Sequence, residues 1–338
     1  MPTTPNYSVL RDQFSFHLKE KMLAHESLYK YCNYRIGGPA DLFFDARAVE
    51  ELKQVAEEAA SLRLPFQVIG RGTNILFRDE GYSGLIIRNS STCLDFISKN
   101  DTSSNKSSSS SSEHSNETFF LRAASGTLMS EFIRYVAENR ALDFDAVEAF
   151  QGLPGSLGGA VYGNAGCFGK EFGELVEAVD ILDLSSGKAL FRTLKKNDPI
   201  DGITFSYRTS TLKEMNSSQQ NQSTHVVILQ IYLRLPMTQT QMVKSDILKL
   251  RASKQPPGYS CGSFFKNPPG KKSAGELIDA AGLKGLQVGG AQISNRHGNF
   301  FLNIKNASAQ NIITLSEIVK KKVKEQFGID LEEEVRIF

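Results

Sequence analysis

The spacing of apolar residues in the first hundred positions predicts a strand, an amphipathic helix and then further strands. The segment 48–64 places apolar side chains at helical spacing. Short apolar runs around it are rich in β-branched and aromatic residues, which predicts strands: DLFFDA (41–46), PFQVIG (65–70), NILF (74–77) and GLIIR (84–88). This β-α-β-β series indicates a mixed α and β fold.

The same pattern returns in the middle of the chain. TFFLRAA (118–124) predicts a strand and TLMSEFIRYVAENR (127–140) a helix. VEAVDILDL (176–184) and KALFRTL (188–194) predict two strands paired around a turn, and HVVILQIYLRL (225–235) predicts a further strand. The middle of the chain should therefore form a sheet with a helix beside it.

Two polar segments interrupt these elements. Residues 98–117 are of low complexity and almost without apolar groups, so burial cannot offset the entropy of ordering them. The segment MNSSQQNQST (215–224) is polar in the same way. We expect both to be surface loops, and the first to be disordered.

The last hundred residues have a different organisation. A helix near 238–253 is expected to end at the Lys-Gln-Pro-Pro sequence 254–257, which is a plausible domain boundary. Helices near 273–282 and 308–326 and a closing strand, EEVRIF (333–338), follow. A second, smaller domain is therefore predicted after the middle sheet.

Composition describes a globular protein and excludes several classes of partner. The 338 residues allow two or three domains, and the formal charge of +2 argues against nucleic acid or a membrane surface as a partner. We find neither a membrane span nor a signal peptide. The four cysteines stand far apart, so neither a disulfide nor a metal site is predicted. We expect a cytoplasmic protein.

Seven glycines fall within nineteen residues, 151–169, out of 27 in the whole chain. Ordered glycine is costly, and it is accepted where φ must be positive or where a ligand touches the backbone. No Walker sequence is present, and the Gly70-Arg71-Gly72 turn continues into strand rather than helix, which argues against a Rossmann unit. Two separated turns remain, 70–74 and 152–166. They either bind an extended pyrophosphate ligand through backbone N–H groups or only pack tightly against a sheet.

Six motifs resemble the UDP-N-acetylenolpyruvoylglucosamine reductase family of bacterial peptidoglycan synthesis. In the family's order they are NYRIGGPADLFF (33–44), VIGRGTNILFRDEGYSGLIIR (68–88), FQGLPGSLGGAVYGNAGCFG (150–169), FSYRTS (205–210), KQPPGYSCGSFFKNP (254–268) and LEEEVRIF (331–338). The absence of a tyrosine-bearing substrate loop makes the chain similar to the family's shorter, second type.

The resemblance implies an α+β fold in two domains. An FAD-binding domain of the PCMH/vanillyl-alcohol-oxidase-like type, with two α+β subdomains, would span 30–236 and contain both polar inserts. A segment 1–29 would precede it, and a smaller α+β substrate-binding domain would span 237–338. The expected state is a monomer.

The resemblance also implies a reaction. NADPH reduces bound FAD, and hydride then passes from flavin N5 to C3 of the enolpyruvyl group on UDP-N-acetylglucosamine. Protonation at C2 gives UDP-N-acetylmuramate. The partners are thus small molecules, while the flavin supplies the redox chemistry and the protein supplies positioning and a proton.

Three residues match the family's catalytic positions. Ser263 matches the proton donor, Arg208 the arginine that stabilises the developing carboxylate dianion, and Glu334 the glutamate that assists the proton transfer. Without the resemblance, Ser263 would be interpreted as a turn residue and Arg208 as a surface ion pair. Glu332 would face the same way as Glu334 in a strand, so the choice between them rests on the distance to the Val-Arg pair that follows.

Binding residues follow from the same motifs. FAD is expected at Gly70, Arg71, Gly72, Thr73, Asn74, Gly152, Gly155, Ser156, Gly159, Asn164, Ala165 and Gly166. Lys254 and Asn267 match positions that hold the UDP moiety, and His297 matches a histidine of the shorter type. The segment 255–261 is one residue shorter than the family's pattern, so the shape of the Ser263 loop is not carried over.

Two other functions are compatible with parts of this pattern. The chain could be a different FAD-dependent oxidase or dehydrogenase of the same superfamily, in which Cys167 could tether the flavin. It could also be a non-catalytic protein that binds nucleotide sugars. Retention of Arg208, Ser263 and Glu334 argues against the second.

Overall fold

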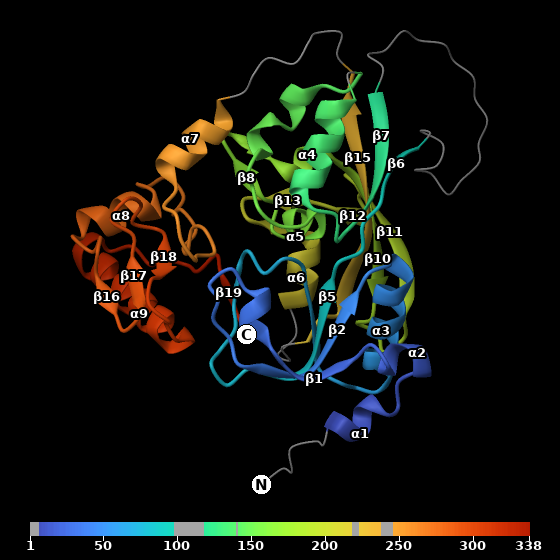
Figure 1. Cartoon of the computed structure of the whole chain (residues 1–338). Helices are drawn as coiled ribbons and strands as arrows, with labels where there is room; N and C mark the ends of the chain where they lie inside the picture. Colours follow the sequence, from blue (N-terminus) through green and yellow to red (C-terminus); the bar gives the residue numbers. More distant parts are fainter. Residues whose placement is uncertain (1–6, 98–117, 140, 218–222, 238–245) are drawn as a thin grey trace.

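The computed structural model describes residues 7–97, 118–139, 141–217, 223–237 and 246–338. Two larger sheets, of four and six strands, and a C-terminal unit make up the described part of the chain (Figure 1). The serine-rich segment 98–117, expected to be disordered, lies outside these described residues. Within them, no helix has both the length and the apolar character needed to cross a membrane.

The N-terminal sheet has four strands in the order β1-β2-β5-β3. β2, β5 and β3 are parallel, and β1 is antiparallel to β2. Their bounds are β1 Leu23–Ser27, β2 Pro39–Ala46, β3 Phe66–Ile69 and β5 Tyr82–Asn89. The predictions of β2, β3 and β5 are confirmed. The pattern did not predict β1, which brings part of the segment 1–29 into this sheet. Two short helices, α1 (Tyr7–Arg11) and α2 (Phe16–Lys19), precede β1 in the chain.

Helix α3 (Val49–Ser61) confirms the predicted amphipathic helix and connects the two sheets. Glu50 and Glu51 lie in its first turn, where negative charge complements the helix dipole. Its buried face packs into the same cluster as Leu85 of β5 and Leu229 of the second sheet. One helix thus fixes how the two sheets of the FAD-binding region stand relative to each other.

The second sheet has six strands in the order β12-β11-β10-β15-β7-β6. It is antiparallel except for the β11–β12 pair. The predicted pairing of 176–184 with 188–194 is confirmed as β10 with β11. The bounds are β6 Leu94–Ile97, β7 Thr118–Ala124, β10 Val176–Asp183, β11 Leu190–Lys196, β12 Gly202–Ile203 and β15 Val226–Pro236.

Helices α4 (Met129–Glu138) and α5 (Leu157–Tyr162) pack into the core of this second sheet (Figure 1). Two further sheets each consist of a pair of two-residue strands. They are β8 (Gly166–Cys167) with β9 (Lys170–Glu171), and β13 (Phe205–Ser206) with β14 (Thr209–Ser210). The prediction of helix 127–140 is confirmed as α4.

The prediction of a polar loop at 215–224 is partly wrong. Residues up to Ser217 belong to helix α6 (Thr211–Ser217), whose Leu212 is buried. Thr224 is also buried. Its N–H donates to the Phe66 carbonyl, and its Oγ1 accepts from the N–H of Val68. Only 218–222 lie outside the described residues.

The described residues of the C-terminal unit form three helices and a small sheet. Helix α7 is described from Ile247 to Lys254, and 238–245 of the predicted helix lie outside the described residues. The expected helices are confirmed as α8 (Ala274–Ala280) and α9 (Ala309–Phe327). The sheet β16-β17-β18 consists of Gln287–Val288, Ala291–Ile293 and Phe301–Asn303.

The C-terminal unit and the N-terminal sheet share one hydrophobic core. Phe264, Phe301 and Ile312 cluster with Phe43 and Phe77. The closing strand β19 (Arg336–Ile337) crosses back and pairs in parallel with β4 (Ile75–Leu76), just after the first glycine turn. Figure 1 shows this red strand reaching the blue part of the chain. The last residues of the chain are thereby fixed beside the predicted cofactor turn.

Candidate active site

The two glycine turns, far apart in the sequence, lie face to face. A Cβ on Gly70 would stand 2.4 Å from Ser156 Oγ, and one on Gly155 would stand 3.0 Å from Thr73 Oγ1. Gly155 has a φ of +122°, which side-chain-bearing residues rarely adopt. The contact between the turns thus requires glycine at both positions, and at Gly155 the backbone conformation requires it as well.

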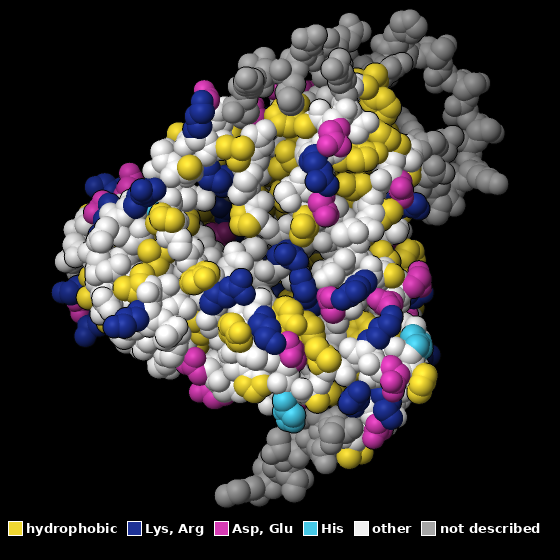
Figure 2. All heavy atoms as spheres, in the orientation of Figure 1, with side chains coloured by type: hydrophobic (Ala, Val, Ile, Leu, Met, Phe, Trp, Pro, Cys, Tyr) yellow, Lys and Arg dark blue, Asp and Glu magenta, His cyan; other side chains and the backbone are white. Residues whose placement is uncertain are grey.

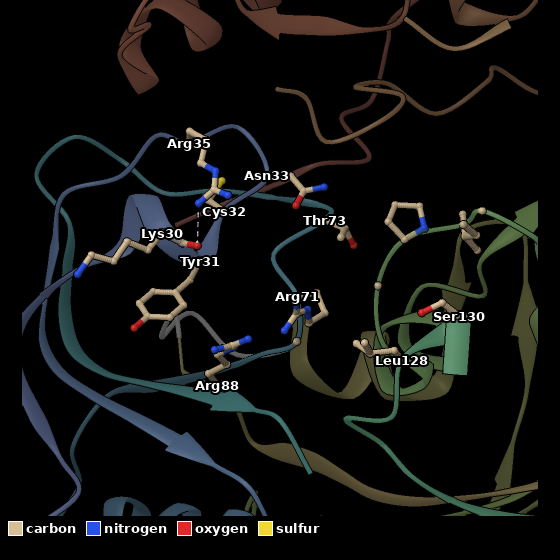
Figure 3. A pocket seen from close by; sticks show the side chains of 15 residues that line it. Lys30, Tyr31, Cys32, Asn33, Arg35, Arg71, Thr73, Arg88, Leu128 and Ser130 are labelled. Carbon is tan, nitrogen blue, oxygen red and sulfur yellow. Dashed lines mark hydrogen bonds between the residues drawn. The ribbon is translucent and has the colours of Figure 1, made fainter. Parts of the chain in front are cut away.

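A cavity of about 450 Å³ opens between these turns (Figure 3). Its size falls within the range of ligand sites, about 300–1,000 Å³. Of the predicted residues, Gly70, Arg71, Thr73, Gly152 and Gly155 line it. The other lining residues were not predicted as cofactor residues: Lys30, Tyr31, Cys32, Asn33, Arg35, Arg88, Leu128, Ser130, Leu153 and Pro154.

The cavity is electrostatically positive. Lys30, Arg35, Arg71 and Arg88 line it, and none of its fifteen lining residues is acidic. Figure 2 shows Lys and Arg side chains gathered along the central hollow on this face. Four cations around one cavity favour a ligand that carries several negative charges.

Tyr31 forms one wall of the cavity and is held rigidly. Its ring stacks on Phe43 with 4.3 Å between centroids, and the Arg88 guanidinium lies 5.4 Å from the ring centroid. Its hydroxyl donates to Glu26 Oε1 at 2.9 Å. Burial, aided by Glu26, raises the pKa of Tyr31 to about 12. The tyrosine is therefore a neutral wall of the cavity.

Helix α4 begins at the edge of the same cavity. Leu128 and Ser130 line it, and the Met129 N–H donates to the Gly155 carbonyl at 3.0 Å. A helix N-terminus carries partial positive charge that stabilises phosphate. Backbone turns, four cations and this helix end fit the pyrophosphate of FAD.

Several predicted cofactor residues make hydrogen bonds that hold the turns in place. Asn74 donates through Nδ2 to the Glu334 carbonyl at 3.1 Å and accepts at its own carbonyl from the Arg336 N–H. Asn164 is fully buried, and its Nδ2 donates to Glu171 Oε2 and to the Ser206 carbonyl.

Other residues in and beside the two turns also make contacts within the protein. Ser156 caps α5 by accepting from the Gly159 N–H. Ala165 accepts at its carbonyl from the Phe172 N–H. Cys167, the possible flavin tether, donates its thiol to the Ala149 carbonyl at 2.9 Å. Gly72, with a φ of +66°, lies against the Tyr31 carbonyl, where a Cβ would be only 1.8 Å from the oxygen.

Arg208 and Glu334 meet although 126 positions separate them in the sequence. Arg208 Nε lies 2.8 Å from Glu334 Oε1, and their side chains are only 20% and 17% exposed. The Nε–H makes no aligned hydrogen bond, so the contact is an ion pair. The Arg208 guanidinium also borders the second glycine turn, because a Cβ on Gly166 would lie 3.0 Å from Nη1.

The Ser263 loop is attached to the segment that carries Glu334. The Glu334 N–H donates to the Phe264 carbonyl at 2.8 Å, and Ser263 bridges to Phe300. Buried Asn299, not predicted, accepts from the Phe265 N–H at Oδ1 and donates from Nδ2 to its carbonyl. Ser263 is half-buried and directly precedes Phe264, the residue whose carbonyl accepts from the Glu334 N–H.

Burial and nearby cations act oppositely on Glu334. Burial raises the pKa of its carboxyl, while Arg208, Lys213 and Lys266 lower it, with burial the largest effect. The neighbouring Glu332 pairs instead with Lys266 and is mostly exposed. Glu334, the glutamate that the sequence motif selected, is the one beside Arg208.

The predicted substrate residues are less closely assembled. Lys254 is exposed at the last position of α7. The Asn267 N–H donates to the hydroxyl of Tyr207, which precedes Arg208. His297 is half-buried, its Nδ1 accepts from the Asn299 N–H at 3.2 Å, and burial lowers its pKa. His297 stays a predicted substrate residue.

Comparison with known proteins identifies the class and then the family. Residues 40–191 match the family model described as FAD binding domain. The chain thus contains an FAD-binding domain. Residues 253–338 match the model described as UDP-N-acetylenolpyruvoylglucosamine reductase, C-terminal domain.

Relatives cover nearly the whole chain. UDP-N-acetylenolpyruvoylglucosamine reductase of Chloroflexus aggregans is 34% identical over 93% of this chain and 96% of its own length. That of Chlamydia abortus is 35% identical over 92% of each. The crystal structure of the reductase from Thermus caldophilus has a TM-score of 0.64 at 28% identity and covers 94% of this chain and 98% of its own. The chain therefore belongs to the UDP-N-acetylenolpyruvoylglucosamine reductase family.

Proposed function

We propose that this chain reduces UDP-N-acetylglucosamine enolpyruvate to UDP-N-acetylmuramate with NADPH and FAD, and that Arg208, Ser263 and Glu334 carry out the protein's part. Family membership and the FAD-binding match support the overall reaction. The observation that supports the residue roles is the half-buried Arg208–Glu334 ion pair beside the Ser263 loop.

The positive cavity would hold the cofactor. Arg71, Thr73 and the backbone of Gly70 and Gly155 line the place where the two turns meet, and Arg88 lines the same cavity. These groups would bind the pyrophosphate and orient the ring system. Bound FAD supplies the hydride that it receives from NADPH.

Arg208 would offset the negative charge that develops on the substrate carboxylate. A guanidinium donates two parallel hydrogen bonds to a carboxylate, which suits this task. Its side chain is already oriented by the ion pair with Glu334, so little reorganisation is needed when charge develops.

Ser263 would give the proton at C2 of the substrate. A hydroxyl is a weak acid and needs a neighbour that restores its proton. Glu334 would assist, because burial raises its pKa and so favours the protonated form that can pass a proton on. Lys254 and Asn267 would bind the UDP moiety at the edge of the C-terminal unit.

We further propose that the enzyme is a cytoplasmic monomer. Four free cysteines are compatible with a reducing compartment, and one chain supplies both the cavity and the ion pair. We place the domain division near residue 237, between the two family-model matches.

The decisive experiment separates the two half-reactions. The purified protein should be yellow, and NADPH oxidation should accelerate when the enolpyruvyl sugar nucleotide is added. Ser263→Ala should leave flavin reduction by NADPH intact and slow reoxidation by the substrate about 10²- to 10⁴-fold. Ser260→Ala, in the same loop, is the matched control. A colourless protein, turnover only with other substrates, or normal reoxidation in Ser263→Ala would contradict the proposal.

A further inference from the structure

Arg208 adopts a conformation that an arginine does not adopt freely. It is the second central residue of the two-residue turn between β13 and β14, where Ser206 pairs with Thr209. Its φ is +57°, in the left-handed region. Such a conformation in a residue other than glycine persists only where surrounding contacts hold it.

Lys213 makes a contact of this kind. Its Nζ donates to the Arg208 carbonyl at 3.0 Å. The side chain starts from the first turn of α6 and folds back toward the β13–β14 turn, and it is half-buried. The bond fixes the peptide that follows Arg208 and so limits rotation of the residue that bears the guanidinium.

The ammonium of Lys213 also belongs to the charge cluster of the site. Its electrostatic neighbours are Glu334 and Glu332, which favour its charged form, and Lys266 and Arg336, which oppose it. Glu334 in turn faces Arg208, Lys213 and Lys266. Removing Lys213 would leave that carboxyl with two of these three cations.

We propose that Lys213 is a positioning residue of the reductase: it holds Arg208 in its left-handed conformation through the backbone carbonyl and adds positive charge beside Glu334. The inference rests on the proposed function of Arg208 and Glu334. It assigns no contact with substrate to Lys213. Both effects act on the step in which the substrate carboxylate gains charge and C2 is protonated.

Lys196 offers a matched control. Its Nζ also donates to backbone carbonyls, of Gly173 at 2.8 Å and Glu174 at 3.2 Å, and it is also half-buried. Burial lowers the pKa of both lysines. Lys196→Met therefore reproduces the loss of a lysine–carbonyl bond at a place away from the ion pair.

The experiment measures the two half-reactions in FAD-loaded Lys213→Met, Lys213→Arg and Lys196→Met. For Lys213→Met, flavin reduction by NADPH should stay within about twofold of wild type while kcat and substrate-driven reoxidation fall about tenfold, with a smaller change in KM. This corresponds to about 1.4 kcal/mol of transition-state stabilisation. Lys213→Arg should recover part of the rate because it keeps the charge, and Lys196→Met should reoxidise normally.

The pH dependence gives a readout that a purely structural role would not move. Glu334→Gln identifies the limb of the pH–rate profile that belongs to Glu334. Lys213→Met should move that limb to higher pH, because one of the cations that lower the pKa of Glu334 is gone. The same upward shift should appear in the carboxyl titration of flavin-free protein with isotope-labelled glutamate. Lys213→Arg and Lys196→Met should leave it in place.

Normal reoxidation in Lys213→Met, an equal loss in Lys196→Met, or an unmoved Glu334 titration would overturn the role of Lys213. Wild-type turnover of the enolpyruvyl sugar nucleotide is measured first. If the wild type turns over and the variants disagree, only the positioning role fails. If the wild type fails to turn over, the proposed function fails.

Discussion

The contact between the two glycine turns can be tested by a single added methyl group. Gly70→Ala puts a Cβ 2.4 Å from Ser156 Oγ, which no packed structure accepts. The φ of Gly70 is not in the left-handed region, so alanine meets no backbone strain there. Any cost of the substitution therefore reports the distance between the turns.

The expected magnitude follows from what must move. Either the two turns move apart or the Ser156 side chain rotates. Moving the turns apart is a case of overpacking and should lower the free energy of unfolding by about 2 kcal/mol. Rotation breaks its bond with the Gly159 N–H and so loses the cap of α5, about 1 kcal/mol. After Ser156→Ala, the nearest atom to the new methyl is the Cβ of residue 156 at 3.4 Å, an ordinary contact. Gly70→Ala should then cost less than about 0.5 kcal/mol, because it also stiffens the unfolded chain.

The assay is a double-mutant cycle. Urea unfolding of the flavin-free forms of the wild type, both single variants and the double variant should give a coupling of about 1.5 kcal/mol. Gly163→Ala, whose Cβ meets only the Gly159 carbonyl at 3.7 Å, is the control and should be nearly neutral. FAD affinity should fall in Gly70→Ala and recover in the double variant. Additive free energies would refute the face-to-face arrangement.

Three further predictions concern buried polar groups. Asn164→Ala removes the acceptor of the buried Gly173 N–H and should lower the free energy of unfolding by about 2 kcal/mol in urea titrations. Arg251, nine-tenths buried, donates to the Gln151 carbonyl beside the cavity, and Arg251→Lys should weaken FAD binding about fivefold by titration. Burial raises the pKa of Glu334 in the folded state above its pKa in the unfolded state. The folded protein therefore loses stability as the pH rises from the unfolded-state pKa through the folded-state pKa. The unfolding free energy of wild type minus Glu334→Gln should fall over that range, and a flat difference would contradict it.

Regular elements followed closely from the sequence because each has its own apolar period. β2, α3, β10 and α9 lie where the pattern placed them. The error at 215–217 has a local cause. The stretch is polar, yet it continues α6, whose burial of Leu212 is not visible in the composition of the insert.

Cavity residues outside the glycine motifs were missed for a different reason. Arg88 lies in a predicted strand and Tyr31 lies just before the first motif, and nothing in their own neighbourhood marks them as ligand contacts. Asn299 resembles any polar loop residue until its two bonds to Phe265 are seen.

The sequence by itself determined the positions of the two glycine turns, since these depend on residue type and local spacing. Its motifs, through their resemblance to the family, also indicated FAD as the ligand and Arg208, Ser263 and Glu334 as the catalytic positions. Only the tertiary structure decided that the turns touch, and that Glu334 meets Arg208 while Glu332 meets Lys266. These are contacts between segments far apart in the chain. They depend on the pairing of β19 with β4 and on the packing of both sheets against α3. No local sequence pattern encodes either of these.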